Sequence, residues 1–331
     1  MKIVADSAIP FLRGVLEPFA EVRYLPGADI SAADVRDADA LVIRTRTRCG
    51  AALLEGSRVR MIATATIGFD HIDTAWCAAH GIEVSTAAGC NARGVLQWVG
   101  AVLADLSRRQ GWQPVQRTLG IVGVGHVGSL VRRYAEAWGF RVLCCDPPRE
   151  ERERCGFLPL GEVAREADLI TFHTPLDATT RHLADAALLA RTKPRAVIIN
   201  SSRGEVVDGE ALKASGREWV LDVWEHEPHI DRELLGKALL ATPHIAGYSE
   251  QGKANATALS VAALARRFGL PLAGWYPPQA AASSPRPIAW QELCDTIGGI
   301  YDIGAESRRL KAHPEDFEAL RDGYAYRREY F

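Results

Sequence analysis

The fold is decided by the stretch LGIVGVGHVGSLVRRYAEAWGFRVLCCD, which runs from Leu119 to Asp146. It opens with an apolar run, 119–122, and closes with a second apolar run, 141–145, and each predicts a buried parallel strand. Between them lie glycines in the spacing G-x-G-x-x-G, followed by apolar residues at helical spacing. This order of strand, glycine turn, helix and strand predicts a βαβ unit.

The glycine turn has the residue spacing that a dinucleotide needs. Gly123 allows a tight turn, Gly125 lets a pyrophosphate approach the backbone, and Gly128 lets the helix pack closely on the strand. His126 and Val127 lie between the last two glycines, where unpaired N–H groups at a helix start favour an anion. The pattern predicts a dinucleotide-binding turn; the alternative is a glycine-rich turn that binds nothing.

The acidic residue at the end of the second strand indicates which dinucleotide binds. Asp146 stands where a carboxylate can accept hydrogen bonds from the two hydroxyls of an adenosine ribose. The same carboxylate would repel the 2′-phosphate that distinguishes NADP. We therefore expect NAD as the cofactor.

Composition excludes several classes of protein. With 331 residues, 47% of them hydrophobic and 24% charged, the chain suggests about two globular domains. The net charge of −2 gives no general attraction to nucleic acid or to an anionic membrane. The seven cysteines are scattered without a C-x-x-C pair, so neither a disulfide framework nor a metal site is expected.

The sequence also predicts where the protein is located. The first residues, MKIVADSAIP, are too short an apolar run for a secretory signal. No apolar run approaches the length that spans a membrane. We therefore expect a cytoplasmic protein without a membrane partner.

Short apolar runs alternate with helical segments through the first 91 residues, and the alternation predicts a parallel sheet covered on both faces. The strands are expected at Lys2–Asp6, Val22–Leu25, Ala40–Thr45, Val59–Thr64 and Ile82–Thr86, and the helices at Phe11–Phe19, Ala32–Asp37, Ala51–Glu55 and Thr74–Ala79. A long helix, capped by Asn91, is expected to lead into the second domain.

The second domain continues the same rhythm after Asp146. Further strands are expected at Ile170–His173, Ala196–Ser201, Val220–Val223 and Leu239–Ala241. A helix over 249–268 is expected to return to the first domain and complete it. We therefore predict a discontinuous first domain, 1–91 with 249–274, and a Rossmann-like domain over 92–248.

The remaining residues, 275–331, begin with a linker rich in Pro, Ala and Ser. Two short helices are expected, at Trp290–Tyr301 and Pro314–Tyr324. So short a region builds little core of its own, so it packs on the parent domain or forms a subunit interface. The arginine pairs 308–309 and 327–328 are interpreted as a solvated surface, with a phosphate contact as the alternative.

Two strand ends of the first domain suggest a ligand site, because doubly wound sheets bind ligands beyond the carboxyl ends of their strands. Arg44, Thr45 and Arg46 follow one strand, and Thr66 follows the next. Guanidiniums and hydroxyls together suit an anionic, hydroxylated ligand. The alternative, ordinary solvated loops, is equally compatible with the pattern.

Three strand-end segments of the second domain hold groups that suit alcohol oxidation: 200–204, 225–228 and 242–248. Arg203 can bind a carboxylate through two hydrogen bonds. His244 can exchange a proton near neutral pH, and Glu227 can orient its ring and stabilise the imidazolium. Spacing alone leaves a structural role for each residue open.

These segments resemble the D-2-hydroxyacid dehydrogenase family. The resemblance is carried by GIVGVGHVG, HTPLDATTRHL, INSSRGEVVD, LDVWEHEP and TPHIAGYS. It implies an enzyme of two Rossmann-like, doubly wound α/β domains in which Arg203, Glu227 and His244 are catalytic. The motifs TATIGFDHID, GCNARGV, LCCDPPR and HIAGYSEQGKANAT resemble a branch that oxidises 4-phospho-D-erythronate with NAD, in pyridoxal 5′-phosphate biosynthesis.

The resemblance also implies further site residues and a partner. Thr45, Thr66 and Tyr248 would line the substrate site, and Arg44 and Arg46 are our candidates for its phosphate. The residues expected near NAD, besides the glycine turn, are Asp146, Thr174, Ser201, Ser202, Arg203, Asp222 and Gly247. Residues 275–331 would form a C-terminal dimerisation region, so the resemblance implies a homodimer.

Two rival functions stay open at the level of sequence. A relative acting on another acid, such as glycerate or 3-phosphoglycerate, would share the catalytic residues. A non-enzymatic, NAD-sensing binding protein would share the fold, although the complete set Arg203, Glu227 and His244 favours an enzyme.

Overall fold

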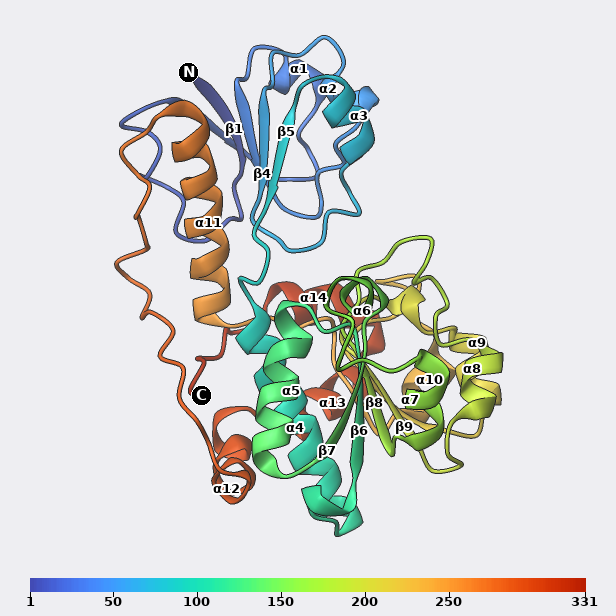
Figure 1. Cartoon of the computed structure of the whole chain (residues 1–331). Coiled ribbons are helices and arrows are strands. Elements are labelled where there is room, and N and C mark those ends of the chain that lie inside the picture. The colour runs from blue at the N-terminus through green and yellow to red at the C-terminus, as the bar shows by residue number, and fades with distance from the viewer. The chain divides into compact units, whose positions relative to one another are not determined.

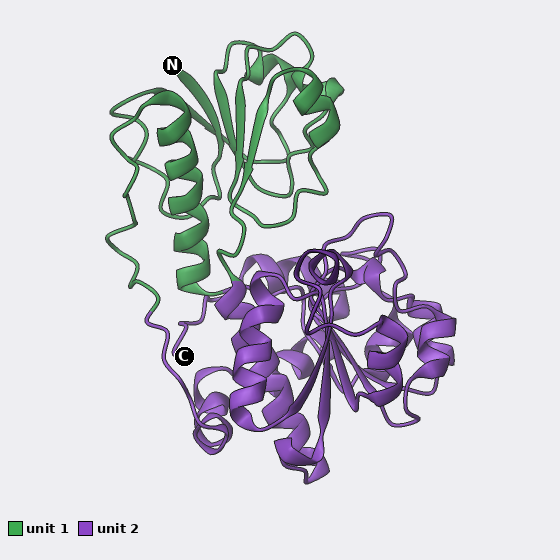
Figure 2. Cartoon of the chain, viewed as in Figure 1, with its two compact units in different colours: residues 1–91, 249–283 green, residues 92–248, 284–331 purple.

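The computed structural model describes residues 1–331 and forms two compact units (Figure 2). Unit 1 comprises 1–91 and 249–283, and unit 2 comprises 92–248 and 284–331. Each unit is described by itself below. Residues 284–331 thus belong to the same unit as the glycine turn, whereas the sequence had suggested a separate region over 275–331.

Unit 1 is a five-stranded parallel sheet with the order β2-β1-β3-β4-β5. Successive residues of a strand pack on opposite faces of the sheet: Val4 belongs to one hydrophobic cluster, and Ile3 and Ala5 belong to another. Both faces are therefore covered, as the sequence predicted. The strands are β1 Lys2–Asp6, β2 Glu21–Leu25, β3 Ala40–Ile43, β4 Met61–Thr64 and β5 Glu83–Thr86.

One face of this sheet is covered by three short helices and the other by a long helix that returns from residue 250 (Figure 1). The helices are α1 Ala32–Val35, α2 Ala51–Leu54, α3 Thr74–Ala79 and α11 Glu250–Phe268. Ser249 caps α11 by accepting from the Gly252 N–H, at 2.9 Å.

The helix expected over Phe11–Phe19 is wrong, because this segment forms turns instead. Phe11 and Gly14 have positive φ angles, 62° and 83°, and left-handed residues interrupt a right-handed helix. Leu12 and Leu16 are nevertheless fully buried. Their spacing of four residues matched a helix, although turns bring them to the same core.

Unit 2 is built on a six-stranded parallel sheet with the order β11-β10-β9-β8-β6-β7. The chain enters at β6 and places β7 on one side and β8 on the other. Such a reversal of strand order creates the crevice in which doubly wound sheets bind ligands. The strands are β6 Thr118–Val122, β7 Arg141–Cys145, β8 Leu169–Phe172, β9 Val197–Asn200, β10 Glu218–Leu221 and β11 Leu240–Ala241.

Helices cover both faces of this sheet (Figure 1). One core joins α4, α5 and α12, and the other joins α7 to α10. The helices through residue 237 are α4 Ala92–Gln110, α5 His126–Trp138, α6 Pro147–Glu153, α7 Leu160–Glu166, α8 Ala186–Arg191, α9 Gly209–Ala214 and α10 Arg232–Lys237. Short 3-10 turns are η1 Pro114–Gln116 and η2 Gly204–Val206. The α/β fold of two Rossmann-like units is confirmed.

The C-terminal residues contribute to both cores of unit 2. Phe331 packs with α4 and α5, whereas Leu310 and Phe317 pack in the opposite core. The elements are α12 Trp290–Ile300, α13 Ile303–Ala312, η3 Pro314–Asp316 and α14 Phe317–Asp322. The sequence did not predict α13, because few of its residues are apolar; it is held against β11 and α4 by tertiary packing.

Two further findings concern the whole chain. None of the helices combines the length and the apolar character that crossing a membrane requires. All seven cysteines are free thiols, and five of them are buried.

Candidate active site

The glycine turn after β6 depends on close backbone approach at two positions. Gly123 has a φ of 84°, and a Cβ there would lie 2.7 Å from the carbonyl oxygen of His173. A Cβ on Gly128 would lie 2.0 Å from the carbonyl oxygen of Gly123. Apart from Gly125 itself and its two neighbours in the chain, no residue has an atom within 4 Å of a Cβ on Gly125. Two glycines thus serve the fold, whereas Gly125 faces open space at the start of α5, where His126 and Val127 follow.

Asp146 links this turn to the end of β7. Its Oδ2 accepts a hydrogen bond from the Val124 N–H at 2.7 Å, and its Oδ1 accepts from the Arg149 N–H at 3.0 Å. Arg149 in turn donates to the Val124 carbonyl oxygen at 2.7 Å. Each carboxylate oxygen keeps a second lone pair, so the arrangement leaves acceptor capacity for a ribose hydroxyl. The contact with NAD itself stays a prediction.

Two hydroxyls at neighbouring strand ends lack a hydrogen-bond partner. The Oγ1 of Thr174, after β8, and the Oγ of Ser201, after β9, are buried and make no hydrogen bond within the protein. Buried hydroxyls in native proteins are almost always paired. Both residues were predicted near NAD, and together with the open space at Gly125 they fit a dinucleotide across the strand ends.

Asn200 shapes the loop that carries Arg203. Its Oδ1 accepts hydrogen bonds from the backbone N–H and the hydroxyl of Ser202, at 3.0 and 2.7 Å, and its Nδ2 donates to the Arg203 carbonyl oxygen at 2.8 Å. The loop lies directly against a second one, because a Cβ on Gly204 would lie 2.0 Å from the Trp224 carbonyl carbon. Long-range packing thus places Arg203 beside the segment that leads to Glu227.

The structure brings Glu227 and His244 into direct contact. The Oε2 of Glu227 lies 2.8 Å from the Nδ1 of His244, and its Oε1 accepts from the Trp224 N–H at 3.0 Å. A carboxylate can only accept, so the ring proton is assigned to Nδ1 and the lone pair to Nε2. The two side chains are 18% and 26% exposed. His244 therefore has the tautomer that a general base requires, with the lone pair on Nε2.

Electrostatics keep the Glu227 carboxyl charged. Burial by itself raises the pKa of this group, but the His244 ring, the Arg321 guanidinium and the Trp224 N–H outweigh it, so the pKa lies below its ordinary value of 4.5. A charged Glu227 stabilises an imidazolium on His244. The pair can thus take up a proton from an alcohol.

A buried carboxylate holds the His244 loop in place. Asp222 is 1% exposed, and it accepts from the backbone N–H groups of Ile245 and Ala246, at 2.8 and 2.9 Å, and from the Thr242 hydroxyl at 2.6 Å. Burial raises its pKa above the ordinary value. His244 itself has a φ of 57°, so a strained backbone is held by these contacts. The NAD contact predicted for Asp222 stays a prediction.

Two C-terminal arginines reach this loop, and sequence reasoning missed both. Arg321 donates from Nε to the Tyr248 hydroxyl at 3.2 Å, and its Nη1 lies 3.6 Å from the Oε2 of Glu227. Arg327 is 6% exposed and donates to the Ile245 carbonyl oxygen at 3.1 Å. The interpretation of Arg327 as part of a solvated surface is wrong. No short motif marks these residues, because their partners in this loop are more than seventy positions away.

The predicted substrate residues of the first domain lie within unit 1, at the ends of β3 and β4. The Thr66 hydroxyl lies 2.6 Å from that of Thr64, while Thr45 and Arg46 are exposed. Arg44 pairs with the buried Asp6 at 3.0 Å, so part of its charge is balanced. A hollow of about 360 Å³ in unit 1 is lined by residues 48–53 and 70–73. The roles of these residues toward a substrate stay predictions.

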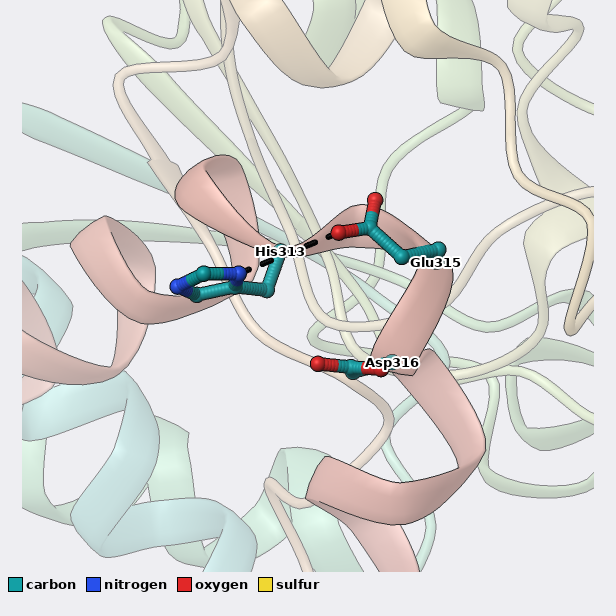
Figure 3. Close-up of side chains that lie close together, drawn as sticks. All are labelled: His313, Glu315 and Asp316. Carbon is teal, nitrogen blue, oxygen red and sulfur yellow. Dashed lines mark ion pairs between the residues drawn. The ribbon is translucent and has the colours of Figure 1, made fainter.

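One cluster of metal-ligand types lies on the surface of the C-terminal region. His313, Glu315 and Asp316 point toward one another (Figure 3), and their ligand atoms lie within 4.8 Å of one another. All three are exposed, and exposed acidic groups commonly remain without a metal. The cluster therefore gives no positive indication of a metal site.

Comparison with known proteins agrees with this geometry. Residues 94–246 match the family model described as D-isomer specific 2-hydroxyacid dehydrogenase, NAD binding domain. Among solved structures, the TT0316 protein from Thermus thermophilus is 26% identical, with a TM-score of 0.67, covering 85% of this chain and 100% of its own. Fold and site together define an NAD-dependent dehydrogenase of the D-2-hydroxyacid class.

Relatives of nearly full length narrow this class. The erythronate-4-phosphate dehydrogenase of Bacteroides fragilis is 47% identical, over 99% of this chain and 97% of its own. The enzyme of the same name from Ectopseudomonas mendocina is 44% identical, over 99% of this chain and 93% of its own. The chain belongs to the erythronate-4-phosphate dehydrogenase family.

Proposed function

We propose that this enzyme oxidises the 2-hydroxyl of 4-phospho-D-erythronate with NAD, to (R)-3-hydroxy-2-oxo-4-phosphobutanoate. The observation that carries the proposal is the Glu227–His244 pair, 2.8 Å apart, in a chain whose relatives of nearly full length have this activity in their name. A phosphorylated 2-hydroxy acid is the substrate class that this name describes.

The residues of unit 2 divide the chemistry between them. Arg203 binds the C1 carboxylate and polarises the oxygen at C2. His244 takes the hydroxyl proton on Nε2 as the C2–O bond becomes a carbonyl, and Glu227 stabilises the imidazolium that results. The hydrogen at C2 leaves with its electron pair; NAD, when bound, accepts this hydride at the nicotinamide ring. The proton and the hydride account for both hydrogens that the alcohol loses.

NAD is held by residues at the carboxyl ends of the unit 2 strands. The turn formed by Gly123, Gly125, His126, Val127 and Gly128 would hold the pyrophosphate, because the α5 N-terminus favours an anion. Asp146 would bind the adenosine ribose. The unpaired hydroxyls of Thr174 and Ser201 support their role as contacts. The remaining proposed contacts are Ser202, Arg203, Asp222 and Gly247.

The substrate's other groups are assigned to residues of unit 1 and to Tyr248. Thr45 and Thr66 supply hydroxyls that line the substrate site. Arg44 and Arg46 supply positive charge for the 4-phosphate, and Arg46 is the more exposed of the two. Arginine suits this role because its planar fork matches phosphate oxygens.

The resemblance supports three further proposals about the protein in the cell. The reaction would be a step of pyridoxal 5′-phosphate biosynthesis. The enzyme would work in the cytoplasm, and it would be a homodimer in which 275–331 contributes to the interface. Size-exclusion chromatography with light scattering tests the dimer directly, since a monomeric mass at working concentration would contradict it.

The test of the substrate is a comparison of acids under identical conditions. Purified enzyme is incubated with NAD and 4-phospho-D-erythronate, with a coupled step that removes NADH, and products are followed by NMR. We expect the 2-oxo acid, and a kcat/KM at least tenfold above that for 3-phosphoglycerate, D-glycerate or unphosphorylated erythronate. Higher activity on one of those acids would replace the proposed substrate with that acid.

A further inference from the structure

We infer that the C-terminal region is part of the active site of its own chain, with Arg321 as a positioning residue for the Glu227–His244 pair. This inference deepens the proposed function, since it rests on the assignment of His244 as the base. It differs from the dimerisation role that the family resemblance implies for this region.

Arg321 joins two groups of the site through one guanidinium. Its Nη1 lies 3.6 Å from the Oε2 of Glu227, which is the same oxygen that lies 2.8 Å from the Nδ1 of His244. Its Nε donates to the Tyr248 hydroxyl at 3.2 Å. Because a guanidinium is planar and rigid, it holds the carboxylate and the phenol at a fixed separation. The side chain is only 23% exposed, so solvent screens these contacts weakly.

The positive charge of Arg321 acts on Glu227, the hydrogen-bond partner of His244. Glu227 faces two cationic or ionisable groups, His244 and Arg321, and also the Trp224 N–H. Buried Asp222 also interacts electrostatically with His244. Arg321 therefore helps to keep Glu227 ionised while the base accepts a proton. Without it, burial would favour the protonated carboxyl, which supports an imidazolium less well.

A second C-terminal arginine fixes the backbone that follows His244. Arg327 donates to the carbonyl oxygens of Ile245, at 3.1 Å, and Ala246, and to that of Gly94 at 2.9 Å. Its guanidinium carbon lies 4.4 Å from the centre of the Tyr301 ring.

The same two residues, Ile245 and Ala246, are held from both sides. Their N–H groups donate to the buried carboxyl group of Asp222, and their carbonyl oxygens accept from the buried guanidinium group of Arg327. An arginine buried without such acceptors would destabilise the fold. The arrangement therefore ties the position of His244 to the C-terminal region of the same chain.

Two variants and a matched control test the inference. Arg321→Gln removes the charge and Arg321→Lys keeps it. Arg308→Gln, on α13, removes an arginine whose side chain is 73% exposed and 3.8 Å from Asp302. We expect Arg321→Gln to lower kcat/KM by about 10- to 100-fold and to move the acid side of its pH profile to higher pH. Lysine should recover part of the loss, while NAD binding and the thermal midpoint stay near those of the wild type.

A purely anchoring role for Arg321 predicts the opposite pattern. The thermal midpoint would fall and the pH profile would keep its shape, and that result would overturn the inference. Arg308→Gln should leave kcat/KM, the pH profile, NAD binding and the thermal midpoint unchanged. That result would show that losing a surface charge in this region does not by itself lower activity.

A readout without substrate separates this inference from the proposed function. The Hδ1 proton of His244, in its hydrogen bond to Glu227, can be followed by NMR in the wild type and both variants. We expect its resonance to move in Arg321→Gln and to return toward the wild-type position in Arg321→Lys. An unmoved resonance contradicts the inference even if the enzyme oxidises 4-phospho-D-erythronate, and a moved one supports it even if another acid is the substrate.

Discussion

Two loops at the carboxyl edge of one sheet, the glycine turn after β6 and the His244 loop after β11, reach unusual backbone conformations by different means. Gly123 has a φ of 84° and His244 has a φ of 57°. Glycine adopts such an angle without steric cost. In a residue with a side chain the same angle is strained, and it is kept only where contacts with other residues hold it. The first loop is therefore built locally and the second by distant partners.

Those partners come from three parts of unit 2. Asp222 accepts from the N–H groups after His244, Arg327 donates to the carbonyl oxygens, and Trp98 donates to the Thr242 hydroxyl at 3.0 Å. The cofactor turn thus depends on residue type at a fixed spacing. The His244 loop depends on the completed fold, including the C-terminal region.

The largest expected effect separates chemistry from cofactor binding. His244→Ala removes the base but leaves the glycine turn intact, so kcat should fall by about 10²- to 10⁴-fold. NAD affinity, measured by fluorescence titration, should change less than threefold. Retained turnover would show that another group removes the proton.

Alanine substitutions at Gly128, which packs closely, and at Gly125, which faces open space, should have different effects. A Cβ on Gly128 would lie 2.0 Å from a carbonyl oxygen, so Gly128→Ala should lower the thermal midpoint and weaken NAD binding by about 100-fold, or ~2.7 kcal/mol.

Gly125→Ala is the matched variant, because no residue beyond its two chain neighbours has an atom within 4 Å of the added carbon. It should weaken NAD binding while the thermal midpoint stays within a degree or two of the wild type. Equal thermal midpoints for Gly128→Ala and Gly125→Ala would contradict the inference that Gly128 serves the fold and Gly125 serves the ligand.

Asp222→Asn tests whether the His244 loop depends on the buried carboxyl group. The amide cannot accept from both N–H groups and the Thr242 hydroxyl, so stability should fall by about 1–3 kcal/mol, and kcat should fall with it. Chemical unfolding and steady-state kinetics measure the two effects. A loss of activity without any loss of stability would mean that Asp222 acts on the ligand rather than on the loop.

The smallest expected effect is in the pH dependence of stability. The pKa of Glu227 is lower in the folded protein than its ordinary value of 4.5, so its stabilising contribution is complete above pH 4.5. This contribution is lost as the pH falls from 4.5 through the folded-state pKa. The difference in free energy of unfolding between the wild type and Glu227→Gln, measured by urea unfolding, should therefore become smaller below pH 4.5. A difference in free energy of unfolding that does not change with pH would contradict a charged Glu227 paired with His244.

Much of the fold could be predicted from periodicity. Each expected strand is present, with ends that differ by a residue or two, because buried parallel strands are short apolar runs bounded by turns. The failures share one cause: Leu12 and Leu16 suggested a helix that turns replace, and the polar α13 gave no signal at all. In both places tertiary contacts outweigh local propensity.

The candidate site divides in the same way. Arg203, Glu227 and His244 could be singled out because each follows a strand and has suitable chemistry. Their mutual distances, and the arrival of Arg321, could not, since both depend on loops that meet only in three dimensions.

By itself the sequence determined the parallel sheets and the glycine turn, and it predicted NAD as the cofactor, because these follow from patterns between residues that are close along the chain. Only the tertiary structure decided that Glu227 contacts His244, that Asp222 and Arg327 hold the loop between them, and that the C-terminal region joins this site. The physical reason is that the strained His244 loop is stabilised by buried polar groups from remote elements, and a pattern along the sequence does not show which remote residues will supply them.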